Sequence, residues 1–214
     1  MKTEDLISAL AADPVASAPV PRVESRLPGF LVLGLLVTAL AFTLVLGPRP
    51  DLLAALARPM VLAKTLLPLL LAALALPLVL RDARPGARFG LPGTLIWAVP
   101  LAVAGLFLLA LLTTAPADRL RLFLGHSIPV CLPAITLLSL PILAGLLAAL
   151  RRGAPVRPAR CGALAGLVAA GLATAIYSTF CIEDSPLFYA VWYSAGVGIA
   201  TGLGAVAGRR WLRW

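Results

Sequence analysis

The amino-acid sequence predicts an all-α polytopic membrane protein with six transmembrane helices, short loops and both termini on the cytosolic side. Of its 214 residues, 61% are hydrophobic and 13% are charged, whereas soluble domains hold about 25% charged residues. Six apolar stretches are each long enough to cross a hydrocarbon core of about 30 Å, and helices satisfy their own backbone groups in lipid. These stretches are Leu27–Gly47, Pro59–Leu80, Leu91–Thr113, Ile128–Leu150, Cys161–Ile182 and Pro186–Ala207.

Three parts follow from this pattern: an N-terminal segment 1–26, a transmembrane domain 27–208 and a basic tail 209–214. The N-terminal segment opens with a short helical pattern, for which Thr3 is the expected N-cap. Glu4 and Asp5 would then lie at the positive end of the helix dipole. Asp13-Pro14 ends the pattern, and a linker rich in Pro and Ala is expected to lead to the membrane as an extended tether.

The N-terminal helix is predicted to bind a protein partner. Leu6, Ile7 and Leu10 fall on one face of it. A helix this short is only marginally stable alone in water, so an apolar groove on a partner would stabilise it. Glu4 and Asp5 make the segment suited to a basic partner. The alternative is a disordered tail without a binding role.

The loops are short, and prolines interrupt several spans. Loops 48–58 and 114–127 are each expected to hold a turn or two of interfacial helix, whereas loop 183–185 can hold only a turn. Asp184 or Ser185 is expected to cap the sixth span, with Pro186 at its first position. Prolines predict kinks in spans two to four. They are Pro68, Pro77, Pro100, Pro133 and Pro141.

Charge placement sets the predicted orientation. Most of the 18 Lys and Arg residues flank the ends of the spans that share a side with the two termini. The positive-inside rule therefore places both termini in the cytosol of a bacterium, with the protein in the inner membrane. The net charge of +9 also favours anionic lipid of the bilayer. Direct nucleic-acid binding is disfavoured because the arginines are split among short loops. Lys64, the only charge within a span, is expected to extend to the nearer surface.

Spans five and six carry small residues at every fourth position, which predicts close helix packing. The stripes are Gly162, Gly166, Ala170, Thr174 and Ser178 in span five and Gly196, Ala200, Gly204 and Gly208 in span six. Packing between these two spans is the first interpretation. A homodimer face is the alternative.

Cys131 and Cys181 are predicted to lie on the same membrane face, opposite the N-terminus. A disulfide would join them if their Cα atoms lie within about 7 Å. Reduced thiols could instead bind a soft metal ion, with His126, Glu183 and Asp184 close by. Two unrelated buried cysteines are the third interpretation. Cys161 lies at the cytosolic end of span five and is expected to be a buried apolar residue.

Catalytic machinery is not visible in the sequence. No predicted span contains Asp or Glu, and motifs for phosphate binding, redox dithiols or zinc proteases are absent. The prediction is therefore a regulator that is not an enzyme and needs no cofactor. A small transporter or channel for an uncharged solute is the competing function. A membrane thiol oxidoreductase is less favoured, because one thiol pair has no second redox partner.

The chain resembles the NrsF-like anti-sigma factors, which are negative regulators of an extracytoplasmic-function sigma factor in proteobacteria. The resemblance rests on the opening Met-Lys-Thr-Glu-Asp-Leu-Ile, the six spans, Cys131 with Cys181, and the string Cys181–Tyr193. It implies that the cytosolic face sequesters a sigma factor at the membrane. It also implies release under stress caused by heavy-metal ions such as chromate or cadmium, with Cys131 and Cys181 as candidate sensors.

Overall fold

The computed structural model describes residues 2–12, 23–84 and 90–213, and all regular structure in these residues is helical. The helices are α1 (Thr3–Ala12), α2 (Val23–Val45), α3 (Leu52–Leu56), α4 (Pro59–Asp82), α5 (Gly90–Leu95), α6 (Ala98–Thr113), α7 (Pro116–Leu124), α8 (Ile128–Leu150), α9 (Pro158–Ser178) and α10 (Pro186–Trp211). Six helical segments within this part are long and apolar enough to cross a membrane, with α5 and α6 together forming the third. The all-α polytopic fold is therefore confirmed.

The helix ends differ most from the predicted spans in three places. The first spanning helix begins at Val23, because Glu24 pairs with Arg84 and this polar turn continues into the apolar helix. The fifth ends at Ser178, and the chain then forms an irregular loop to Ser185. The sixth continues to Trp211, so the first half of the predicted tail is helical. As expected, the Ser185 hydroxyl caps α10 by accepting a bond from the Leu187 amide.

The third span is not one continuous helix. A turn at Ile96 and Trp97 separates α5 from α6. Pro100 lies in the first turn of α6, where its lack of an N–H costs nothing. The prolines of the second and fourth spans instead lie inside α4 and α8. The two loops that were expected to hold a turn or two of helix contain α3 and α7.

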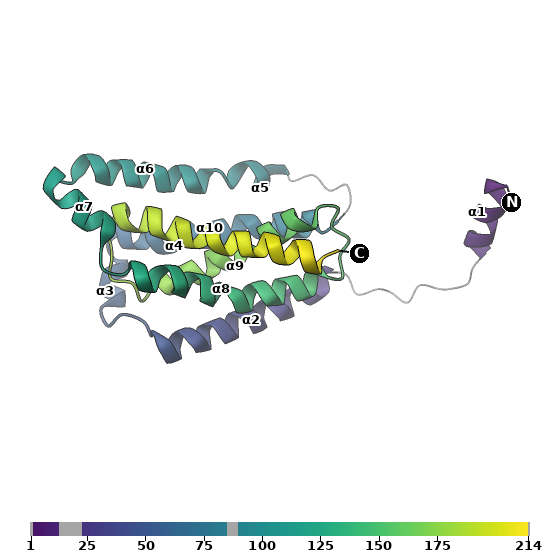
Figure 1. Cartoon of the computed structure of the whole chain (residues 1–214), viewed down its shortest axis with the longest axis horizontal. Helices are drawn as coiled ribbons and strands as arrows, with labels where there is room; N and C mark the ends of the chain where they lie inside the picture. The colour runs from purple at the N-terminus through teal and green to yellow at the C-terminus, as the bar shows by residue number, and fades with distance from the viewer. Residues whose placement is uncertain (1, 13–22, 85–89, 214) are drawn as a thin grey trace.

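Helix α9 is the centre of the bundle, and α4, α8 and α10 pack around it (Figure 1). In the apolar 18-residue stretch of α9, 67% of the residues are buried, against 11% in the corresponding stretch of the α5–α6 span. Helix α2 packs on α8, and α6 lies on the outside against α10 and α4. Helix α1 stands apart from the bundle in Figure 1.

The small-residue stripes pack α9 directly on α10. A Cβ atom added to Gly162 would lie 2.6 Å from the Cα of Gly208, and one added to Gly166 would lie 2.8 Å from the carbonyl oxygen of Ala200. The two helices therefore approach backbone to backbone. Because this stripe is buried within one chain, it does not present a face to a second copy.

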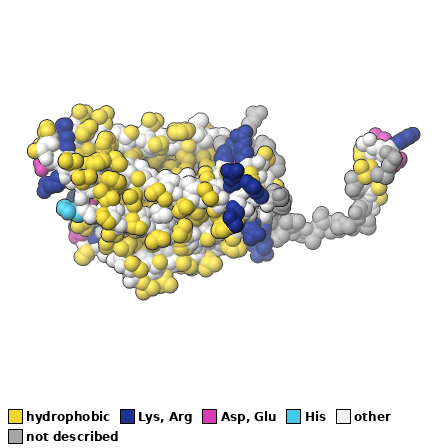
Figure 2. Space-filling view, in the orientation of Figure 1, with side chains coloured by type: hydrophobic (Ala, Val, Ile, Leu, Met, Phe, Trp, Pro, Cys, Tyr) yellow, Lys and Arg dark blue, Asp and Glu magenta, His cyan; other side chains and the backbone are white. Residues whose placement is uncertain are grey.

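The two ends of the bundle differ in charge. Figure 2 shows a cluster of Lys and Arg side chains at one end of the bundle, an apolar middle, and a mixture of basic, acidic and His side chains at the other end. We call the first of these the arginine end; it carries Arg84, Arg151, Arg152, Arg157, Arg160, Arg209 and Arg210. The opposite end, the Asp184 end, is formed by α3, α7 and the loop 179–185. Helix α2 starts at the arginine end, so the chain leaves α1 on that side.

Candidate functional site

The structure brings Cys131 and Cys181 into one buried cluster at the Asp184 end. Cys131 belongs to the first turn of α8, and Cys181 lies in the loop after α9. Both side chains are fully buried in an aromatic cluster with Tyr177, Phe188 and Tyr193. The predicted juxtaposition of the two cysteines is therefore present, and both are free thiols in this structure.

Tyr177 is one of the aromatic residues that pack around this cysteine pair. Its buried hydroxyl has no hydrogen-bond partner within the described structure. Its ring packs edge to face on Tyr193, with centroids 5.8 Å apart, and tilts against Phe180 at 5.9 Å. Such ring pairs fix side-chain positions and keep water away. The thiols are thus held in a tight aromatic cluster that contains Tyr177, Tyr189 and Tyr193.

The other residues predicted for a metal site are arranged differently. His126 has a side chain that is 92% exposed, and its backbone amide donates to Glu183 Oε1 at 2.8 Å. Its Nδ1 lies 3.8 Å from the same oxygen. Within the described residues, no three side chains of His, Cys, Asp or Glu form a group that could hold a metal ion. The structure therefore does not join the thiols, His126, Glu183 and Asp184 into one coordination sphere.

Lys64 holds the loop that carries Cys181, a role that the sequence analysis did not predict. Its side chain is 0% exposed, so the expectation that it reaches toward the surface is wrong. The ammonium donates to the Cys181 carbonyl at 2.7 Å, to Asp184 Oδ1 at 2.7 Å and to the Glu183 carbonyl at 3.2 Å. An ammonium group has three donors, and each has a partner here.

Two arginines complete this ion network around Asp184. Arg49 lies 2.9 Å from Asp184 Oδ1, and Arg58 lies 2.8 Å from Oδ2. Arg49 also pairs with Asp51 at 2.7 Å and donates its backbone amide to the Thr179 carbonyl. Burial alone would raise the pKa of Asp184, but the hydrogen bonds and charges of Lys64 and Arg49 outweigh it and hold that pKa below its ordinary value.

The sequence contained a signal for this network. A single charge in an apolar span needs a partner, because an unpaired buried charge is costly. Asp184 and Glu183 were the acidic residues of the shortest loop. The network ties the segment with Cys181 to α4, through Lys64 within the helix and through Arg58 at its N-cap.

Helix α1 presents the predicted contact residues to solvent. Leu6 is 42% and Ile7 is 55% exposed, and Glu4 and Asp5 are also exposed. The predicted Leu10 contact and the linker residues 13–22 lie outside the described side chains and residues.

The predicted Thr3 cap is wrong by one residue. Thr3 is the first helical residue, and the Lys2 carbonyl accepts from the amides of Asp5 and Leu6. The Lys2 amide in turn donates to Asp5 Oδ2 at 3.1 Å, as in a capping box.

Close packing links the helix of Cys131 to the helix that follows α1. The Thr38 hydroxyl of α2 donates to the Leu138 carbonyl of α8 at 2.9 Å. Nearby, a Cβ added to Gly34 would lie 2.8 Å from the Cα of Ile142, and one added to Gly145 would lie 2.5 Å from the Phe30 carbonyl oxygen. Helices α2 and α8 therefore behave as one packed pair.

A family model and two similar proteins all point to the same family. The model of the NrsF family, described as negative regulator of sigma F, matches residues 10–214. The anti-sigma-F factor NrsF of Caulobacter vibrioides (strain NA1000 / CB15N) is 42% identical over 221 aligned positions that cover 100% of both chains. The probable anti-sigma-F factor NrsF of Azospira oryzae is 34% identical with the same coverage. No solved structure matches the chain. These matches show that the chain belongs to the NrsF family of negative regulators of sigma F.

Proposed function

We propose that this protein is a transmembrane anti-sigma factor that sequesters an extracytoplasmic-function sigma factor at the bacterial inner membrane. The observation that carries the proposal is the match of the whole chain to anti-sigma-F factors. The exposed Leu6 and Ile7 of α1 supply an unpartnered apolar face for the sigma factor. The competing function of a small transporter or channel has no support among these relatives.

The arginine end faces the cytosol in this proposal. Arginines flank spanning helices on the cytosolic side, and α2 begins at the same end, so α1 also lies there. The cysteine cluster and the Asp184 end then lie on the side of the periplasm, which is an oxidising compartment. The proposed stress sensor and the proposed sigma-factor contact therefore lie at opposite ends of one bundle.

The sigma factor itself provides the test of sequestration. Detergent-solubilised full-length protein is expected to capture a sigma factor from cytosolic extract, identified by mass spectrometry. A chain that starts at Val23 keeps all six spanning helices but lacks α1, and we expect it to capture none. A sigma factor bound equally by both proteins would show that α1 is not the contact. Absence of a sigma factor from both would contradict the proposed function.

The stress signal is proposed to act at Cys131 and Cys181. An oxidant would take two electrons and two protons from the thiols and leave one S–S bond; a soft metal ion would instead bind both thiolates. Either product would change the packing of Cys131, at the start of α8, against Tyr177 at the end of α9. The change would reach α1 through the packed α2–α8 pair. A tenfold release of the sigma factor needs about 1.4 kcal/mol of difference between the two states.

Removal of both thiols tests this sensor. The double substitution Cys131→Ser and Cys181→Ser is expected to fix sigma-dependent transcription at one level during exposure to cadmium or chromate. Cys161→Ser is the matched control, since Cys161 is equally buried but lies near the arginine end. A reporter gene measures the response. An unchanged stress response in the double variant would rule out the cysteine pair as sensor.

A further inference from the structure

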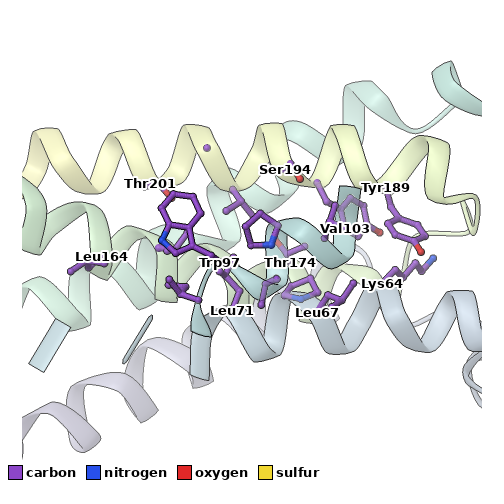
Figure 3. A pocket seen from close by; sticks show the side chains of 18 of the residues that line it. Lys64, Leu67, Leu71, Trp97, Val103, Leu164, Thr174, Tyr189, Ser194 and Thr201 are labelled. Carbon is purple, nitrogen blue, oxygen red and sulfur yellow. The ribbon is translucent and has the colours of Figure 1, made fainter. Parts of the chain in front are cut away.

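A cavity of about 610 Å³ lies between α4, α6, α9 and α10. Figure 3 shows Lys64 and Tyr189 at one end of it, Leu164 toward the other, and Trp97, Thr174 and Thr201 between them. From Lys64 to Leu78 it follows α4 for about 21 Å at 1.5 Å per residue. It is therefore an elongated slot that runs through most of the depth of the hydrocarbon core.

The slot is accessible from the lipid. One wall is the α5–α6 span, the least buried of the six, which contributes Ile96, Trp97 and Val103. The other walls are mostly aliphatic, for example Leu67, Leu71 and Leu167. An occupant of such a slot comes from the bilayer and has a long apolar body.

Unpartnered hydroxyl groups mark the inside of this slot. Thr174, Tyr189 and Tyr193 are at least 96% buried, Thr201 is partly buried, and all four line the cavity. None of their hydroxyl oxygens has a hydrogen-bond partner within the described structure. Buried polar groups normally have such partners. A ligand with hydrogen-bond acceptors would supply them.

The ligand has no net charge. Lys64 is the only charged residue of the lining, and its three donors are already used by Asp184 and two carbonyl groups. A carboxylate or phosphate head would therefore find no free cation. A cationic ligand would find no carboxylate among the lining residues. Uncharged carbonyl oxygens are the acceptors that suit hydroxyl donors in this setting.

We propose that this slot binds a lipid-soluble quinone. The class combines a flat uncharged ring, two carbonyl acceptors and a long isoprenoid tail. The hydroxyls of Thr174 and Thr201 bind the carbonyl oxygens, Trp97 contacts the ring, and the aliphatic walls of α4 and α9 hold the tail. A phospholipid chain fits the apolar walls but leaves the hydroxyls at mid-depth without acceptors.

The proposed ligand would also contact the thiol cluster. Tyr193 lines the slot and belongs to the cluster around Cys131 and Cys181. Occupancy of the slot therefore fixes a side chain that the cysteines pack against. A quinone bound here would change the environment of the thiols through that contact.

Two glycines of α10 allow a matched test. A Cβ atom added at Gly198 or at Gly202 meets nothing within 4 Å, so larger side chains fit at both positions. Only Gly198 lines the slot. Full-length wild-type, Gly198→Leu and Gly202→Leu proteins in lipid nanodiscs would be titrated with decylubiquinone, and quenching of tryptophan fluorescence would be recorded. Thermal unfolding of each variant would verify that it is folded.

We expect saturable quenching in wild type and Gly202→Leu and its loss in Gly198→Leu. Trp97→Phe should remove most of the saturable quenching, because Trp97 is the tryptophan that lines the slot. The double substitution Thr174→Val and Thr201→Val should weaken binding about tenfold, the effect of two lost hydrogen bonds. Lipid extracts of the purified proteins should contain quinone with wild type and Gly202→Leu but not with Gly198→Leu.

Two results would overturn the proposal. Equal quenching in folded Gly198→Leu and Gly202→Leu would show that the probe does not bind in the slot. Extracts that contain only phospholipid, together with quenching that never saturates, would show that lipid chains fill the space instead.

Discussion

Replacing Leu6 and Ile7 of α1 with Asp is expected to free the sigma factor and abolish repression. Both side chains are exposed on one face of a helix that stands apart from the bundle. Each apolar side chain buried in a partner's groove contributes about 1.5–3 kcal/mol. Loss of two such contacts weakens binding by roughly a hundredfold or more. Titration of the sigma factor against the protein in nanodiscs measures the change in affinity.

Ser8→Asp is the control for this substitution. Ser8 lies in the same exposed helix, on the side away from Leu6 and Ile7 at 100° per residue. It adds a negative charge without removing an apolar contact, so binding should change little. Thermal unfolding of the bundle should be the same for all variants. Full repression by the Leu6→Asp, Ile7→Asp protein would exclude this face as the contact.

Among substitutions in the ion network, Asp184→Asn is expected to cause the largest decrease in the free energy of unfolding. The substitution leaves Lys64, with a side chain that is 0% exposed, without its counterion, and removes the carboxylate shared by Arg49 and Arg58. Breaking a buried ion pair from one side costs about 3–5 kcal/mol. Unfolding in detergent, followed by circular dichroism, measures the loss.

Lys64→Met is the matched comparison for Asp184→Asn. It should cost less, because Asp184 keeps Arg49 and Arg58 as partners. The reverse order of stability would show that Asp184 does not act as the centre of the network.

The pH dependence of stability provides a second test of the role of Asp184. The pKa of Asp184 is held below its ordinary value by Lys64 and Arg49 against the opposing effect of burial. A group with a lowered folded-state pKa contributes stability above its unfolded-state pKa of about 3.9 and loses it as the pH falls through the folded-state value. Wild-type stability should therefore decline more steeply below about pH 4 than that of Asp184→Asn. Equal slopes would contradict this assignment.

The sequence predicted the helices well because hydropathy and span length follow directly from the solvation of backbone in lipid. It also predicted the packing of α9 on α10, since Gly162 and Gly166 on α9, like Gly204 and Gly208 on α10, are four residues apart. It did not predict the ion network, because Lys64 and Asp184 are 120 positions apart and only the tertiary fold joins them. The predicted surface position of Lys64 rested on the general tendency of lysines near helix ends to extend toward the membrane surface. In the structure Lys64 is instead buried, because it pairs with Asp184.

The positions of Cys131 and Cys181 could be predicted in part from the sequence, but the side chains around them could not. Alternation of the spans placed Cys131 and Cys181 at the same end, and the structure confirms that they share one cluster. The cluster formed by Tyr177 and Tyr193 depends on the close α9–α10 contact and on side-chain packing. No spacing in the sequence specifies that arrangement.

The glycine-mediated contact of α9 and α10 has a consequence for biosynthesis. These two helices have the lowest mean hydropathy of the six, 1.6 and 1.4, against 2.1 or more for the others. Small residues give close packing at the expense of apolar surface, so each helix alone partitions weakly into lipid. The short loop between them lets both leave the translocon as one hairpin that buries its own glycines. Membrane integration of α9 then depends on the synthesis of α10.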